Sequence, residues 1–243
     1  MKARLVNGGI LIEWRELQGD RFDIFRSTHE TGDYEFLAST EGWHHLDKGA
    51  NLYQVDLRYH YKVVAHEGTA STEHGPVSVR AGQHDRYALK MMQEYDVLLR
   101  VMNNPTMKLL AKRRHAKKCP DCWNPVTRKV RFANCKRCDG TGELSGYHRP
   151  MEVRVSREIS SYVSSIVPED IDKVTLTPVS GWVAASPSIM NEDVLIDREG
   201  IRYLVQNVTP RTKGQAVIRY MFQASPLEKG HPAYLAEEGN WDE

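Results

Sequence analysis

CPDCWNPVTRKVRFANCKRC, residues 119–138, holds all four cysteines of this 243-residue chain. The cysteines form two C-x-x-C pairs separated by twelve residues. Two residues between paired cysteines allow a tight turn that brings both sulfurs to one metal, and twelve residues can form a hairpin that returns the second pair. Zinc takes four such ligands at tetrahedral corners, with Zn–S bonds of ~2.3 Å. The spacing therefore predicts a structural Zn2+ held by Cys119, Cys122, Cys135 and Cys138.

Other uses of these cysteines fit the spacing less well. A redox dithiol needs only one C-x-x-C, normally at the start of a helix. A catalytic zinc keeps one position open, whereas four thiolates fill the coordination shell. Two disulfides remain an alternative for a chain released into oxidising surroundings. Because Glu13 and Arg15 interrupt the first apolar stretch and no small-residue cleavage site follows, we expect a first strand there instead of a signal peptide, and reduced cysteines.

The residues around the cysteines predict how this small unit is held together. Gly140 and Gly142 follow the second pair, in CDGTG, where the chain must turn away, so we expect both to adopt positive φ. A bound metal would supply the stability that such a short segment lacks. The apolar contacts of the unit are expected to come from Trp123, Val126, Val130 and Phe132.

Charge is distributed unevenly along the chain. The whole sequence has 33 Lys and Arg against 32 Asp and Glu, but residues 85–150 contain 15 against 6. A basic face on a zinc hairpin can neutralise phosphates, which would make binding strongly salt-dependent. A solvated face or an acidic protein partner fits the same pattern equally well. The candidate contacts for phosphate or an acidic partner are Lys112, Arg113, Arg114, Lys117, Lys118, Arg128, Lys129, Arg131, Lys136 and Arg137.

The segment before the cysteines, residues 84–118, is expected to be a helical linker. Leu89, Met92, Leu99 and Met102 lie near helical spacing with charged residues between them. Pro105 excludes the helical conformation at the residue before it, so the helix should end there. We expect a second short helix over residues 106–115, and a Met-rich face that packs against a neighbouring domain or subunit.

Residues 1–83 have the pattern of an antiparallel β-sandwich. Short apolar-alternating stretches, of which RYHYKVVAHEG (58–68) is the clearest, recur at intervals of roughly 8–15 residues without a long helix between them. The hairpin FDIFRST–turn–YEFLAST (22–40), the run from Leu46 to Gly68 and the exit TASTEHGPVSVRA (69–81) resemble a fibronectin type III domain. The resemblance covers about a third of the chain and implies a spacer or adhesion module.

The remainder of the chain returns to β-structure. After the zinc hairpin (119–146), residues 147–229 contain alternating stretches typical of a small antiparallel barrel, with a helical or loop stretch over 156–171. Residues 230–243 form an acidic tail, expected to be a flexible or docking extension. Three carboxylates near the turn at 198–200 are expected to face solvent: Glu192, Asp193 and Asp197. The predicted fold class is therefore mainly β, a multi-domain α+β chain.

Composition excludes several classes of protein. A hydrophobic content of 40% is sufficient for packed cores, so wholesale disorder is excluded. No run approaches the ~20 apolar residues that cross a bilayer, so we expect no membrane contact. The sequence contains no G-x-S-x-G, H-E-x-x-H, P-loop or Rossmann fingerprint, and we expect no enzymatic activity.

The region around the cysteines also resembles a module of tailed-bacteriophage virion proteins from the neck, or head–tail connector. The resemblance rests on three elements in order: C-x-x-C-W-N (119–124), C-x-x-C-x-G-T-G (135–142) and the exit G-Y-x-x-P (146–150). Residues 192–227 look like the small β-barrel that follows in head-closure or adaptor proteins. Together these features cover roughly the C-terminal half of the chain.

This resemblance implies a structural virion protein, assembled in the host cytoplasm as part of a ring between portal and tail. Its partners would be other copies of itself and portal, adaptor or tail components, with nucleic acid as a further partner through the basic segment. Rings of this kind need heterologous interfaces, in which one face of a protomer meets a different face of the next. The alternative is a zinc-ribbon nucleic-acid-binding protein whose β-domains are accessories.

Overall fold

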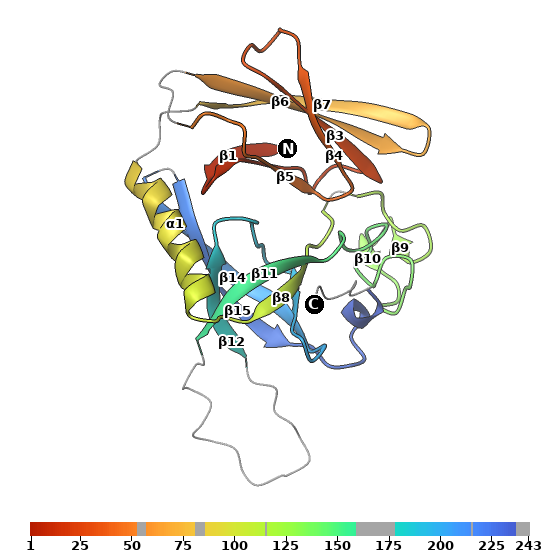
Figure 1. Cartoon of the computed structure of the whole chain (residues 1–243). Helices are drawn as coiled ribbons and strands as arrows, with labels where there is room; N and C mark the ends of the chain where they lie inside the picture. The colour runs from red at the N-terminus through yellow and green to blue at the C-terminus, as the bar shows by residue number, and fades with distance from the viewer. Residues whose placement is uncertain (53–56, 81–85, 115, 159–177, 215, 237–243) are drawn as a thin grey trace.

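The described residues fold into two β-rich lobes, one α-helix, a short 3-10 helix and a cysteine-containing hairpin, as the computed structural model shows (Figure 1). The structure describes residues 1–52, 57–80, 86–114, 116–158, 178–214 and 216–236. This arrangement confirms the predicted mainly β fold class. Within the described residues, no helix is long and apolar enough to cross a membrane.

The N-terminal lobe is a sandwich of two antiparallel sheets, as predicted for residues 1–83. One sheet has the strand order β1-β2-β5 and the other β4-β3-β6-β7. The predicted FDIFRST–YEFLAST hairpin is the β3–β4 pair. The strands are β1 (Lys2–Val6), β2 (Gly9–Glu13), β3 (Arg21–Ser27), β4 (Glu35–Thr40), β5 (His44–Asp47), β6 (Arg58–Glu67) and β7 (Ala70–Arg80).

Alternation within the strands places the sandwich core between the two sheets. Ile10 and Ile12 of β2 point into the same apolar cluster as Ile24 of β3 and Tyr61 of β6, and all four are fully buried. Trp14, immediately after β2, fills the same space and lies 5.6 Å from the ring of Phe22. Burying these side chains is the main favourable term for the lobe.

The predicted helix is present as α1 (Arg86–Val101). Its buried face, Ala88 and Met92, packs against Ala185 and Ile218 of the C-terminal lobe. The expected second helix over residues 106–115 is wrong, because Thr106–Leu110 forms strand β8. In this short apolar run the local pattern does not distinguish a helix from a buried strand.

The C-terminal lobe is a closed antiparallel barrel with the strand order β11-β12-β15-β14-β13-β8. Strand β8 pairs with both β11 and β13 and thereby closes the barrel, so the barrel begins before the cysteines as well as after them. The stretch predicted as helix or loop over 156–171 lies mostly outside the described residues. The remaining strands are β11 (Met151–Glu158), β12 (Val179–Ala184), β13 (Val194–Ile196), β14 (Arg202–Lys213) and β15 (Ala216–Pro226).

The cysteine segment is an insertion between β8 and β11 and contains a two-stranded hairpin, β9 (Trp123–Asn124) and β10 (Lys129–Val130). Residues 230–243 were expected to be a flexible or docking extension, and the first part of this segment docks on the barrel. A 3-10 helix, η2 (Pro232–Leu235), follows the barrel, and Ala233 and Ala236 are buried against it. Residues 237–243 lie outside the described part of the chain.

The two lobes pack directly on each other. Trp43, from the loop before β5, is 1% exposed and belongs to the apolar cluster of the barrel. The backbone N–H of Ser188 in the barrel donates to Glu13 Oε1 at 3.1 Å, and Arg4 Nη2 donates to the carbonyl of Ala185 at 2.6 Å. Polar and apolar contacts therefore join the lobes across a buried interface.

Candidate metal centre

The four cysteines converge on one point at the base of the hairpin. Their sulfur atoms all lie within 4.8 Å of one another, and all four side chains are buried. Sγ–Sγ distances across the two pairs are 3.7 Å for Cys119–Cys135 and 3.3 Å for Cys122–Cys138. Sulfurs on the corners of a zinc tetrahedron lie about 3.8 Å apart, whereas a disulfide requires about 2.05 Å. The donor set therefore fits a four-coordinate metal.

Backbone hydrogen bonds shape both knuckles. In the first, Trp123 N–H donates to Cys119 C=O at 3.0 Å and Arg131 N–H donates to Cys122 C=O at 2.7 Å, which ties the hairpin to the cysteines. In the second, Thr141 donates to Cys138 C=O through both its N–H and its hydroxyl, at 2.8 and 2.7 Å. Each pair is thus held in a turn that points its sulfurs inward.

The glycines after the second pair have the conformation predicted for them. Gly140 has φ +71° and Gly142 has φ +77°. Side chains are also excluded there by contact. A Cβ at Gly140 would lie 2.4 Å from the carbonyl oxygen of Ala133 and 2.4 Å from Pro232, and one at Gly142 would lie 2.8 Å from Val130. The CDGTG string therefore allows the second knuckle to pack closely on the hairpin and on η2.

Burial sets the protonation of the thiols. It raises the pKa of both Cys122 and Cys138. Burial acts in the same direction on Cys119, but N–H groups of Asp121 and Cys122 donate to its sulfur and hold its pKa below the ordinary value. Four thiolates at one buried point require a cation among them, and a metal held by all four would have no open position for catalysis.

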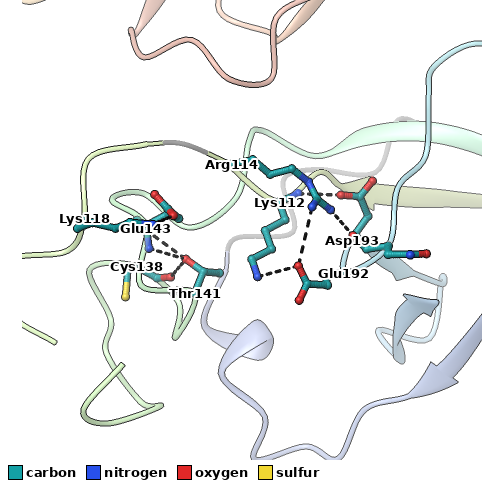
Figure 2. A network of polar contacts seen from close by, with 9 residues as sticks. Lys112, Arg114, Lys118, Cys138, Thr141, Glu143, Glu192 and Asp193 are labelled. Carbon is teal, nitrogen blue, oxygen red and sulfur yellow. Dashed lines mark hydrogen bonds and ion pairs between the residues drawn. The ribbon is translucent and has the colours of Figure 1, made fainter. Parts of the chain in front are cut away.

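The two ends of the insertion are paired with each other where they leave the barrel. Arg113 N–H donates to Gly146 C=O at 3.0 Å, and Lys112 and Tyr147 form an isolated β-bridge. Nearer the cysteines, the ammonium of Lys118 pairs with Glu143 and lies 4.6 Å from the Trp123 ring centroid. Figure 2 shows Lys118 and Glu143 beside Cys138.

The apolar residues of the hairpin divide into two groups. Trp123 and Val130 are half-buried, and Val130 packs against the cysteines, as predicted. Val126 and Phe132 were expected to supply apolar contacts too, but they are 89% and 51% exposed. The cysteine cluster is so small that it encloses few side chains, and Val126 in the turn and Phe132 after β10 point away from it.

Six of the ten candidate basic residues are engaged within the chain. Lys112 pairs with Glu192 at 3.2 Å, and Arg114 contacts Glu192 and the carbonyl of Asn191 (Figure 2). Arg113 donates to Tyr147 C=O at 3.4 Å, and burial lowers its pKa. The other three are Lys117 with Glu67 at 2.8 Å, Lys118 with Glu143, and Arg137 with Asp121 at 3.4 Å.

The other four basic residues project from the hairpin into solvent. Arg128, Lys129, Arg131 and Lys136 are exposed, and the structure gives them no acidic partner among the described residues. The basic segment thus separates into a part that joins the insertion to the two lobes and a smaller part, on the hairpin, that is free to meet another molecule.

The expectation that the three carboxylates face solvent is wrong for two of them. Asp193 is fully buried and accepts from Arg15 at 2.7 Å. It also accepts from the N–H of Lys112 at 3.0 Å (Figure 2). Asp197 is 7% exposed and accepts from the turn N–H groups of Glu199 and Ile201. Only Glu192 is exposed, at 58% of its side chain. The partners of Asp193 are distant in sequence, so local patterns do not reveal its burial.

Comparison with known proteins adds no assignment to this geometry: no family model matches the chain, and no curated protein is detectably similar to it.

Proposed function

We propose that this chain is a structural virion protein of a tailed bacteriophage, forming part of the neck or head–tail connector ring. The motif order that carries the resemblance supports this proposal. The elements C-x-x-C-W-N, C-x-x-C-x-G-T-G and G-Y-x-x-P make up one continuous unit, from the first knuckle to the entry into β11. The proposal includes no enzymatic step.

The observation that carries an assembly role is the outer face of α1. Its inner face packs on the barrel, yet Tyr87, Val97, Leu98 and Val101 are exposed on the helix, and Met102 follows at its end. Residues 97, 98 and 101 lie on one side of a helix with 3.6 residues per turn. A helix that is apolar on both sides is suited to packing between neighbours, so we assign this face to a subunit contact.

Native mass spectrometry of the purified chain, alone and with portal or tail components, tests the proposal. We expect closed oligomers whose formation is lost in V101E/L98E. A matched control is F36E, which changes an exposed apolar residue on β4 of the other lobe and should assemble normally. A chain that stays monomeric at high concentration and joins no portal or tail component would contradict the proposal.

We further propose that the metal is zinc, in a structural role. Within the part of the chain that the structure describes, the cluster has four cysteine sulfurs and no other donor, which suits zinc, and the insertion has no other buried apolar cluster. Metal analysis of the intact protein should find about one zinc per chain. Recovery of a fully folded hairpin after complete chelation would contradict a structural role.

A second candidate function is nucleic-acid binding through the hairpin, favoured by its four basic residues without an acidic partner. Because the other six are engaged within the chain, the informative variant reverses Arg128, Lys129, Arg131 and Lys136 to Glu. For a nucleic-acid binder, the affinity for duplex or single-stranded nucleic acid should fall steeply as salt concentration rises. In a plot of the logarithm of the association constant against the logarithm of the salt concentration, the variant should reduce the steepness of the slope by up to about 0.9 per lost phosphate contact. R21E, an exposed reversal on the sandwich, is the control. Salt-independent or absent binding would exclude this function.

A further inference from the structure

The two strands of the hairpin sort its side chains onto two faces. Val130 pairs with Trp123 across the strands, and Val130 packs against the cysteines. Lys129 pairs with Asn124, and side chains alternate along a strand, so Lys129 lies on the opposite face. The N–H of Arg131 donates at 2.7 Å to a carbonyl of the first knuckle, which continues the same ladder, so alternation places Arg131 on the face of Lys129. The hairpin therefore has an inner face at the cysteines and an outer, basic face.

The outer face is part of a larger basic surface. We define the hairpin surface as Val126, Arg128, Lys129, Arg131, Phe132 and Lys136, all of which are exposed. Residues 122–138 contain no Asp or Glu, and the four basic side chains of this surface have no acidic partner among the described residues. Lysine is depleted at protein–protein interfaces, whereas Lys and Arg are the usual contacts of nucleic-acid phosphates. The hairpin surface is therefore better suited to a nucleic acid than to an acidic protein.

An aromatic ring lies among these cations. Phe132 follows Arg131 directly and precedes Lys136 of the second knuckle. Its side chain is 51% exposed and belongs to none of the apolar clusters of the described residues. A ring held in solvent beside phosphate-binding side chains is the arrangement on which unpaired bases stack. In a duplex the faces of the bases are already covered by neighbouring bases, so this ring favours a single strand.

We propose that the hairpin surface binds single-stranded nucleic acid, with a base stacked on Phe132 and neighbouring phosphates beside Lys129 and Arg131. This inference rests on the nucleic-acid-binding function of the hairpin and adds to it the type of strand and the aromatic contact. Alternate residues of a strand are about 6.6 Å apart, a distance close to that between neighbouring phosphates of an extended single strand. Every base has a face that can stack, so the binding has little sequence preference.

Fluorescence anisotropy of the full chain with three labelled probes of equal length tests the proposal. The probes are oligothymidine, the same backbone with abasic sugars, and a duplex. The natural chain should bind oligothymidine at least about fivefold more tightly than the abasic strand, because only the former can stack. Its affinity for the duplex should be lower than that for oligothymidine. F132A should lower the affinity for oligothymidine to that for the abasic strand and leave the affinities for the other two probes unchanged.

Two variants separate the aromatic ring from apolar bulk and from folding. F132W keeps a ring and should retain the preference for oligothymidine. V126A shortens another exposed apolar side chain of the hairpin surface and should bind all three probes as the natural chain does.

The possible failures are distinguishable. Equal affinity of the natural chain for oligothymidine and the abasic strand, or an unchanged preference in F132A, would overturn the stacking inference but leave nucleic-acid binding by the hairpin in place. Polyglutamate that competes as well as unlabelled oligothymidine would identify a general site for acidic chains and would also overturn the inference. Binding to none of the three probes would overturn the nucleic-acid function and this inference together.

Discussion

Arg15 of the sandwich lobe donates from Nη1 to Asp193 Oδ2 of the barrel at 2.7 Å, with both side chains almost completely buried. The two residues are 178 positions apart. The guanidinium also donates to the carbonyl of Ser188 and lies 4.1 Å from the Trp43 ring centroid, which itself belongs to the barrel core. One charged group therefore binds the second lobe through an ion pair and a backbone carbonyl, and it also stacks on Trp43, which the first lobe inserts into the barrel core.

Removing Arg15 should weaken the contact between the lobes and greatly lower the free energy of unfolding. In R15A, Asp193 would keep its burial but lose the charge that compensates it, and such losses cost about 3–5 kcal/mol. We expect the free energy of unfolding, from urea titration followed by circular dichroism, to fall by about that amount. Protease cleavage between the lobes should also become faster.

The exposed pair Arg21–Asp23 provides the control, because its N–O distance is 3.7 Å and the Arg21 side chain is 58% exposed. R21A should change the unfolding free energy by less than about 1 kcal/mol. If R15A were as mild as R21A, the interface would not depend on the buried pair. The double variant R15M/D193N, which removes both charges but keeps a side-chain oxygen that can accept from the N–H of Lys112, should recover much of the loss.

A buried histidine at the same interface predicts a dependence on pH. Burial lowers the pKa of His148 to about 3, and the nearby Arg113 acts in the same direction. Its Nε2 lies 3.2 Å from the carbonyl oxygen of Arg15, so the neutral ring donates there. Below pH 6.5 the unfolded chain binds a proton at this residue that the folded chain does not, so stability falls as pH decreases towards 3.

Between pH 7 and pH 5 this residue should account for a loss of about 2 kcal/mol. Urea midpoints measured at both pH values for the natural chain and for H148Q should show the smaller decrease in the variant. His29, which is exposed, supplies the control: H29Q should retain the full decrease. An unchanged pH dependence in H148Q would mean that other groups produce it.

Local patterns predicted those parts of the molecule whose determinants are close in sequence. The four cysteines, the turn glycines, α1 and the β3–β4 hairpin all follow from spacing or alternation within about twenty residues. Strand β8 cannot be predicted in this way, because TMKLL becomes a strand by pairing with distant segments. Strand β11 lies more than forty residues away in sequence, and β13 lies more than eighty residues away. The burial of Asp193 depends on Arg15, at a still greater distance.

The exposure of Val126 and Phe132 was missed for a different reason. Apolar residues beside a metal site are usually assigned to its core, but four sulfurs around one point leave little volume to fill. In sequence, only the position of Val126 in the turn between the two hairpin strands could have indicated that it faces away. Such side chains are better treated as candidates for contact with another segment.

Disrupting the metal site should unfold the insertion without unfolding the lobes. In C135S one thiolate is lost, and a four-coordinate zinc site with three sulfurs should bind metal much more weakly. Hydrogen exchange should then become fast over residues 119–146. It should stay slow in β2, β3 and β6, whose core contains no residue of the insertion. S145A, a change at an exposed position within the same unit, should retain its zinc. Loss of protection throughout the chain would show that the insertion is needed for both lobes.

The last prediction concerns the close contact of η2 with the second knuckle. Gly140 and Gly68 both have positive φ, +71° and +60°, but only Gly140 is enclosed, since a Cβ at Gly68 would meet no atom within 4 Å. Alanine at either position incurs the backbone cost of about 1–2 kcal/mol. G140A must also displace Pro232 or the Ala133 carbonyl, so we expect it to release zinc to a chelator much faster than G68A, whose site is untouched. Chelator competition followed by absorbance measures both rates, and equal rates would mean that η2 does not support the metal site.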